Sequence, residues 1–175
     1  MALKAAAEAG PTLVAGVSTL SAAIDLGICA RALNLPANRL YESRFVDRMK
    51  ARLRRTGRCS EEDLARCHTI VDIDDQITAP GFGFGTADRY YATQSALRFI
   101  PQIQVPALLI TAQDDPFIPF KIYADQRISE NENIQVIAPR HGGHLGFLSR
   151  HAPRWWADER IVRWLDSQLI QRAPR

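Results

Sequence analysis

The sequence lacks the features that mark several broad classes of protein. Its 175 residues contain three cysteines, and no two of them form a C-x-x-C pair. A set this sparse argues against a disulfide framework and is typical of a reducing compartment, so we expect a cytoplasmic protein. Charged residues and a proline interrupt the apolar N-terminal stretch, and no run approaches the roughly 20 apolar residues of a membrane span. We therefore expect neither a targeting segment nor a transmembrane segment.

A strong charge of one sign and metal-binding patterns are also missing. The net charge is +3, which is too small to indicate a nucleic-acid partner by itself. Cys59, Cys67 and His68 match no common zinc spacing, and His141 and His144 have no cysteine or carboxylate close to them in sequence. We expect no nucleic-acid partner, no metal and no cofactor. The hydrophobic share of 46% and the charged share of 23% are ordinary for one soluble globular domain or a large piece of one.

Short apolar runs alternate with helical patterns along the chain. Strands are predicted at 13–17 and in the apolar runs that begin at Ala107 and Ile134. Strands that alternate with helices indicate an α/β fold with a parallel sheet. The helical block from about 22 to 99 is long for a single crossover and is predicted to be an insertion, such as a lid. Residues from about 100 to 175 are expected to form the core, within one domain that includes all of 1–175.

One helix of the block has a regular apolar pattern. Tyr41, Phe45, Met49 and Leu53 recur every four positions, with Val46 beside them, which predicts an amphipathic helix over 39–54. The other face is basic, with arginines from Arg44 to Arg58. Such a face could bind nucleic acid or an anionic membrane. We interpret it as the solvated face of a lid helix.

Local signals place other boundaries in the block. Ser21 is a candidate N-cap for a helix that runs to about residue 33. Ser60 and Asp63 form a loose capping box for a short helix. The segment 69–84 contains a proline and two glycines and is predicted to be irregular.

Polar residues follow the last two predicted strands at the point where each ends. Asp115 comes directly before Pro116, which fixes the turn, and His144 follows two glycines that permit unusual backbone shapes. An acid and a histidine at the ends of successive strands are two members of a Ser–His–Asp triad. Asp114 competes with Asp115 for the acid and His141 competes with His144, so spacing leaves both choices open. Helix capping by Asp115 and an ordinary loop position for His144 are the alternatives.

The third member of the triad is missing from the sequence. No G-x-S-x-G turn is present, and the nearest match, Gly16-Val17-Ser18-Thr19-Leu20, has leucine where the turn needs a small residue. We therefore expect Ser18 to cap or to pack at a strand end, and not to act as a nucleophile.

Five segments carry a resemblance to a known family. They are Asp115-Pro116-Phe117 with Pro119, Gly142-Gly143-His144-Leu145-Gly146-Phe147-Leu148, Asn38-Arg39-Leu40-Tyr41, the stretch 78–84, and the stretch with Asp88, Tyr90, Tyr91 and Ser95. With them the chain resembles the C-terminal half of an α/β-hydrolase, of the YheT-like branch of esterases. The resemblance implies a partial α/β-hydrolase fold with a helical lid, Asp115 as the acid, and His144 as the base. It also implies hydrolysis of a small-molecule or lipid carboxylic ester by a Ser–Asp–His mechanism without a cofactor.

The chain departs from this family at its start. The family's G-x-S-x-G-G-N-like nucleophile turn stands directly before a helix with a Leu-Lys pair, which here is Leu3-Lys4. The resemblance therefore implies a truncated chain that lacks the serine and a preceding N-terminal half, and that has no esterase activity alone. One alternative is a non-catalytic fragment or binding module that pairs with a separate N-terminal half. Another is an anion-binding helical protein.

Overall fold

The computed structural model describes residues 1–57 and 59–172, with side chains described up to Leu169. Arg58, the last arginine of the predicted basic face, lies outside these residues. The chain folds as two compact units, one made of Met1–Ile24 with the segment from Ala96 onward, and the other made of Asp25–Ser95. We call them the sheet unit and the helical unit. The interpretation of the helical unit as a lid stays a prediction.

The sheet unit contains α1 (Ala2–Leu13), β1 (Val17–Leu20), η3 (Ala96–Arg98), η4 (Ile100–Gln102), β2 (Ala107–Ile110), η5 (Phe120–Ala124), α8 (Gln126–Ser129), β3 (Ile134–Ile137) and α9 (Trp156–Arg172). The helical unit contains α2 (Leu26–Leu33), η1 (Pro36–Asn38), α3 (Arg39–Thr56), α4 (Glu61–Arg66), α5 (Ile70–Ile73), the π-helical turn η2 (Asp74–Thr78), α6 (Ala79–Gly81) and α7 (Ala87–Gln94).

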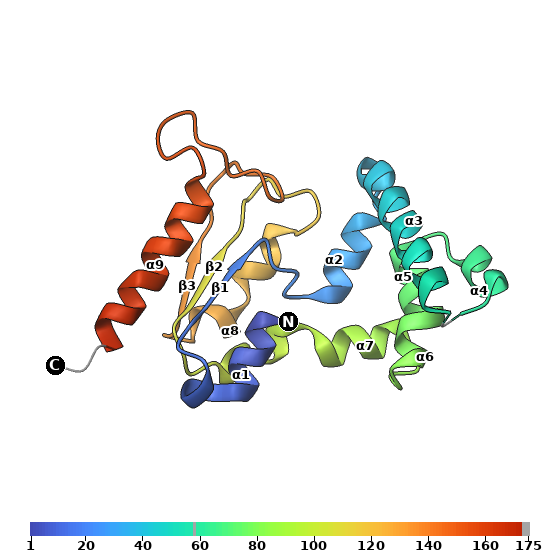
Figure 1. Cartoon of the computed structure of the whole chain (residues 1–175), viewed down its shortest axis with the longest axis horizontal. Coiled ribbons are helices and arrows are strands. Elements are labelled where there is room, and N and C mark those ends of the chain that lie inside the picture. The colour runs from blue at the N-terminus through green and yellow to red at the C-terminus, as the bar shows by residue number, and fades with distance from the viewer. Residues whose placement is uncertain (58, 173–175) are drawn as a thin grey trace. The chain divides into compact units, whose positions relative to one another are not determined.

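The three strands form one parallel sheet in the order β1-β2-β3, which confirms the α/β fold with a parallel sheet. Ala107 is opposite Val17 on one side and Ile134 on the other. All of β2 is buried, and its Leu108 and Ile110 pack with residues of α9, which runs alongside the strands in Figure 1. Because the strands are parallel, their carboxyl ends meet at one edge, and the segments that follow them are brought together.

The first strand lies later in the chain than predicted. The prediction of a strand over 13–17 is wrong, because helical backbone resumes after Gly10, whose φ of 65° breaks α1, and continues to Leu13. Ser18, expected at a strand end, pairs with Leu108 within β1. Its hydroxyl, like that of Thr19, is buried without a hydrogen-bond partner among the described residues. Polar side chains at these positions concealed the strand from the sequence pattern.

Two boundaries of the helical unit also differ from expectation. The N-cap of α2 is Asp25, which accepts a hydrogen bond from the Ile28 N–H at 2.9 Å, and Ser21 is not the cap. The segment 69–84 is largely helical, not irregular, because a capping box between Thr69 and Asp72 starts α5. The predicted capping box of Ser60 and Asp63 is confirmed at the start of α4.

The amphipathic helix predicted over 39–54 is confirmed as α3, but only part of its predicted apolar face is buried. Val46 is buried, and Met49 and Leu53 pack beside it. Tyr41 and Phe45 belong to the exposed side of the helix.

Candidate active site

The candidate site lies at the carboxyl edge of the sheet. Asp114 and Asp115 follow β2, and a loop after β3, which we call the His loop, covers residues 141–147. Ser21 follows β1 directly. The three neighbouring strands therefore each deliver a polar segment to the same edge, as the sequence predicted for the last two.

Asp115 is the most firmly held of these residues. Its side chain is 0% exposed, and its Oδ1 accepts hydrogen bonds from the backbone N–H groups of Phe117 at 2.9 Å and Ile118 at 3.1 Å. Its Oδ2 lies 3.0 Å from Nδ1 of His144. Because an ionised carboxylate only accepts hydrogen bonds, this contact places the ring proton on Nδ1 and leaves the lone pair on Nε2.

His144 is held by its surroundings but still reaches solvent. Its side chain is 31% exposed, and the buried ring of Phe117 packs edge-on against the imidazole with ring centroids 5.1 Å apart. A neutral imidazole with a buried carboxylate at one nitrogen and an accessible second nitrogen is suited to general base and general acid chemistry.

Asp114 contacts the same loop at other atoms. Its Oδ1 accepts from the backbone N–H groups of Gly142 at 3.0 Å and Gly143 at 2.9 Å, and its Oδ2 lies 3.2 Å from Nδ1 of His141. The hydrogen bond from Gly143, followed by the contacts with His141 and Gly142, holds the pKa of Asp114 below its ordinary value. The structure therefore pairs Asp115 with His144 and Asp114 with His141, a distinction that spacing left open.

The two consecutive glycines of the His loop, Gly142 and Gly143, are needed for different structural reasons. Gly143 adopts a φ of 58°, in the region that favours glycine. A Cβ on Gly142 would lie 2.8 Å from the ring of Phe147 and 3.0 Å from Cβ of Ala112. The close packing at Gly142 and the backbone conformation of Gly143 allow the N–H groups of both residues to reach Oδ1 of Asp114.

Ser21 is a site residue that sequence reasoning missed. It is buried, has an uncommon φ of 47°, and its Oγ–H donates to the backbone carbonyl of His144. A small polar residue directly after a strand is a signal that could have identified Ser21. It was missed because the first strand was predicted too early in the chain. Ser18 lies within β1 and not on a strand-to-helix turn.

The described residues contain neither a cluster of metal-ligating side chains nor a helix of membrane-spanning character. Across residues 1–57 and 59–172, no three His, Cys, Asp or Glu side chains are grouped as metal ligands would be. Within the same described ranges, no helix has the length and apolar character that crossing a bilayer requires.

Comparisons with known proteins find relatives that are much longer than this chain. A Dictyostelium discoideum abhydrolase domain-containing protein is 34% identical over 137 residues, which cover 75% of this chain and 35% of that protein. Human monoacylglycerol lipase ABHD2 is 31% identical over 116 residues, covering 61% of this chain and 27% of the lipase. The "putative esterase YheT" of Escherichia coli is 29% identical over 159 residues, covering 86% of this chain and 46% of the esterase.

The matched part of this chain thus spans about a quarter to a half of these relatives. No family model matches the chain, and no solved structure matches it. The relatives and the parallel sheet with flanking helices agree with each other. The chain therefore belongs to the α/β-hydrolase superfamily, of whose longer members it spans a part.

Proposed function

We propose that Asp115 and His144 are the acid and the base of a carboxylic-ester hydrolase. The observation that carries this proposal is the 3.0 Å contact between Asp115 Oδ2 and His144 Nδ1 at the carboxyl edge of the parallel sheet. The names of the relatives, which include monoacylglycerol lipases and an esterase, support an ester substrate. Within this class, a small-molecule or lipid ester of acylglycerol or short-chain type is the proposed substrate.

In the proposed reaction each of these residues has a distinct role. A serine hydroxyl gives its proton to His144 Nε2 as its oxygen attacks the ester carbonyl carbon. The imidazolium then donates that proton to the departing alkoxide, which leaves an acyl-serine. Water, deprotonated by the same nitrogen, attacks the acyl group, and the proton returns to the serine. Throughout, the buried Asp115 carboxylate keeps the proton on Nδ1 and stabilises the positive ring. These steps need no cofactor.

We propose further that the nucleophilic serine is supplied by sequence outside these 175 residues. Ser18 lies within β1, and the Ser21 hydroxyl donates to a backbone carbonyl, so neither has the geometry of a nucleophile turn. Among the described residues, β1 pairs with β2 alone, so its other edge is open to a further strand. The chain by itself is then inactive. The cytoplasmic location expected from the sparse cysteines stays a prediction.

The open edge of β1 also favours a second candidate function. A non-catalytic module could use this edge to pair with a separate N-terminal half. A stable, monodisperse chain with cooperative unfolding would support an autonomous domain instead.

The test compares two proteins made from the same gene. The DNA upstream of the Met1 codon is read in frame. If it encodes a strand that ends in a G-x-S-x-G turn, the extended protein and the 175-residue chain are both assayed with a p-nitrophenyl ester. We expect saturable turnover from the extended protein, none from the short chain, and a loss of about 10³-fold or more in extended His144→Ala.

Two results would contradict the proposal. Saturable hydrolysis by the short chain that disappears on substitution of a serine within it would place the nucleophile inside these residues. Full activity of the extended His144→Ala protein would remove His144 from the chemistry. A stop codon or an unrelated sequence upstream would leave Asp115 and His144 without a nucleophile in the same polypeptide and would favour the non-catalytic module.

A further inference from the structure

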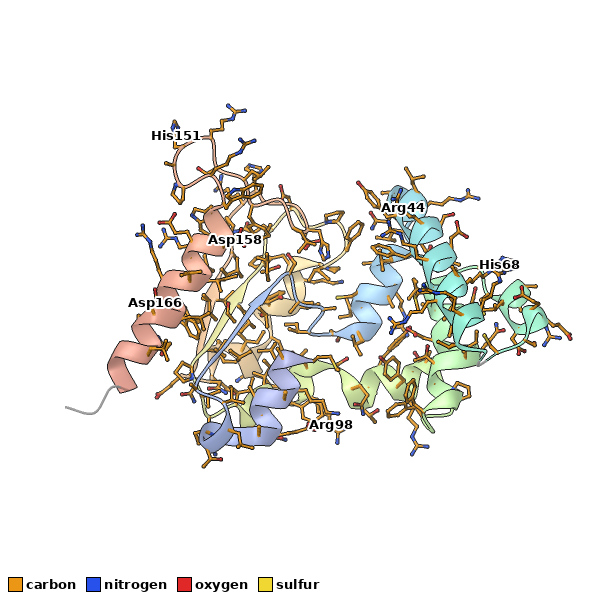
Figure 2. The ribbon with its side chains drawn as sticks, viewed as in Figure 1. Arg44, His68, Arg98, His151, Asp158 and Asp166 are labelled. Atoms are coloured by element: carbon orange, nitrogen blue, oxygen red, sulfur yellow. The ribbon has the colours of Figure 1, made fainter. Side chains whose placement is uncertain are left out.

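The exposed side of α3 carries a surface that the proposed ester hydrolysis does not use. At 100° per residue, eight side chains fall within about 140° of the helix circumference. They are Leu40, Tyr41, Arg44, Phe45, Arg48, Ala51, Arg52 and Arg55, and all eight are exposed. We call them the α3 surface. Arg44 lies in the first half of the helix (Figure 2).

The α3 surface is positively charged from Arg44 to Arg55. It contains four arginines and no carboxylate, and no ion pair joins any of the four to a carboxylate of the described residues. The acids of α3 lie elsewhere, with Glu42 buried and Asp47 beyond the rim. Arg54, which pairs with Glu61, is on another side of the helix. Arginines four residues apart repel one another, so this arrangement is unfavourable until an anionic partner approaches.

Large apolar side chains lie at the N-terminal end of this surface, before and beside Arg44. Leu40 is 82% exposed, and the rings of Tyr41 and Phe45 are 52% and 38% exposed on the same side. The helix thus combines a basic surface with apolar groups that water contacts, over about 22 Å from Leu40 to Arg55. An arginine side chain can keep its guanidinium at a polar boundary while its stem lies against apolar material.

We propose that the α3 surface docks on an anionic phospholipid bilayer, with the helix lying in the plane of the interface. The arginines bind lipid phosphates, and Leu40 and the two rings enter the boundary between headgroups and acyl chains. A nucleic acid would satisfy the arginines but would leave Leu40, the most exposed apolar group of the surface, in water. The apolar component therefore favours the bilayer. This proposal does not rest on ester hydrolysis, because vesicle binding is measured without turnover.

Co-sedimentation of the 175-residue chain with vesicles tests the docking. We expect the chain to bind phosphatidylcholine vesicles that contain about a third phosphatidylglycerol, and to bind pure phosphatidylcholine much more weakly. Raising NaCl from about 0.05 M to about 0.5 M should release most of the bound protein, because the Debye length falls severalfold. Absence of binding to the anionic vesicles at the lower salt concentration would overturn the proposal.

Matched variants separate the α3 surface from net charge. Arg44→Gln/Arg48→Gln/Arg52→Gln should bind at least about tenfold more weakly, since each arginine near an anionic surface contributes roughly fivefold. Arg89→Gln/Arg98→Gln/Arg150→Gln removes the same charge from exposed positions outside the surface and should bind nearly as the wild type does. Circular dichroism confirms that each variant is folded. Equal losses in the two triple variants would show that net charge alone is responsible and would overturn the proposal.

Leu40→Ser provides a test that leaves every charge in place. We expect it to weaken binding to anionic vesicles severalfold while the salt dependence persists. An unchanged affinity for vesicles, together with tighter binding to an RNA or DNA oligonucleotide than to vesicles, would identify a nucleic-acid surface and overturn the bilayer assignment.

Discussion

Two neighbouring aspartates of this chain make different contacts at one site. Each accepts hydrogen bonds from two backbone N–H groups and lies against a histidine ring, but Asp115 is fully buried and contacts His144, whereas Asp114 is more exposed and contacts His141 and the His loop backbone. The sequence left the choice between them open, because residues at the end of a strand enter a turn whose direction the local pattern does not set. In the structure, the N–H groups of Phe117 and Ile118 bind Oδ1 of Asp115 and leave its Oδ2 facing the His144 ring.

The first prediction concerns the tautomer of His144. In Asp115→Asn, the same two backbone N–H groups require an acceptor, so the amide oxygen must face them and the amide NH₂ must face the ring. The ring nitrogen Nδ1 then has to accept, and its proton moves to Nε2. Nitrogen NMR of the neutral imidazole should report Nδ1–H in the wild type and Nε2–H in the variant.

Asp114→Asn is the matched control for this change. It makes the same substitution one residue earlier, and we expect the His144 tautomer to stay as in the wild type because Asp114 contacts His141 and not His144. If Asp115→Asn also keeps the proton on Nδ1, the carboxylate does not select the tautomer and its proposed role fails.

At the scale of elements, the sequence predicted the structures that have a strong local signal. The apolar strands that begin at Ala107 and Ile134, the periodic α3 and the capping box at Ser60 all follow from period and cap chemistry. The strand β1 was misplaced because its hydroxyl residues lie within the sheet, and this pairing is a tertiary contact that the local pattern does not report.

The same limit applies to the faces of helices. Of the large apolar residues of α9, Trp156, Ile161 and Trp164 pack against the buried cluster on the sheet. Val162, Leu165 and Leu169 are exposed instead. A hydrophobic stripe in the sequence indicates that a helix has a buried face. The width of that face depends on the curvature and extent of the surface on which the helix packs. Among the described residues the sheet has three short strands, and this narrow surface buries only a narrow stripe of α9.

The second prediction concerns the His loop as an element and its response to acid. The folded pKa of Asp114 is depressed, first by the hydrogen bond from Gly143, so its stabilisation of the loop is complete above the unfolded pKa of about 3.9 and is lost as pH falls through the folded value. The amide resonances of Gly142 and Gly143 should therefore titrate with a midpoint below about 3.9. Proton–nitrogen spectra collected on lowering the pH measure that midpoint.

Asp114→Asn should remove this titration step from both glycine amides while leaving other acidic transitions in place. A midpoint at or above the ordinary aspartate value, or a step that survives in the variant, would mean that these amides do not sense the Asp114 carboxylate.

At the scale of the whole molecule, the chain leaves the sheet unit once and returns once. It leaves after Ile24 and re-enters at Ala96, and the Leu97 N–H donates to the Ile24 carbonyl at 2.9 Å. Two chain ends held by a backbone hydrogen bond can be joined by a short linker at little entropic cost. Insertions that begin and end at adjacent points are the kind that a domain tolerates.

The third prediction is that the sheet unit folds without the helical unit. Replacing residues 25–95 by a few glycine and serine residues should leave the parallel sheet, the tryptophan environment of α9 and the His144 tautomer as in the full chain, because the ends to be joined are already in contact. Circular dichroism, fluorescence and nitrogen NMR measure these three properties. A control that joins Leu20 to Ala96 instead removes Ile24 and the Ser21 hydrogen bond to His144, and it should lose the native tautomer signal. If the first variant aggregates or unfolds as the control does, the sheet unit depends on residues 25–95 for its stability, and the interpretation of that segment as an insertion is wrong.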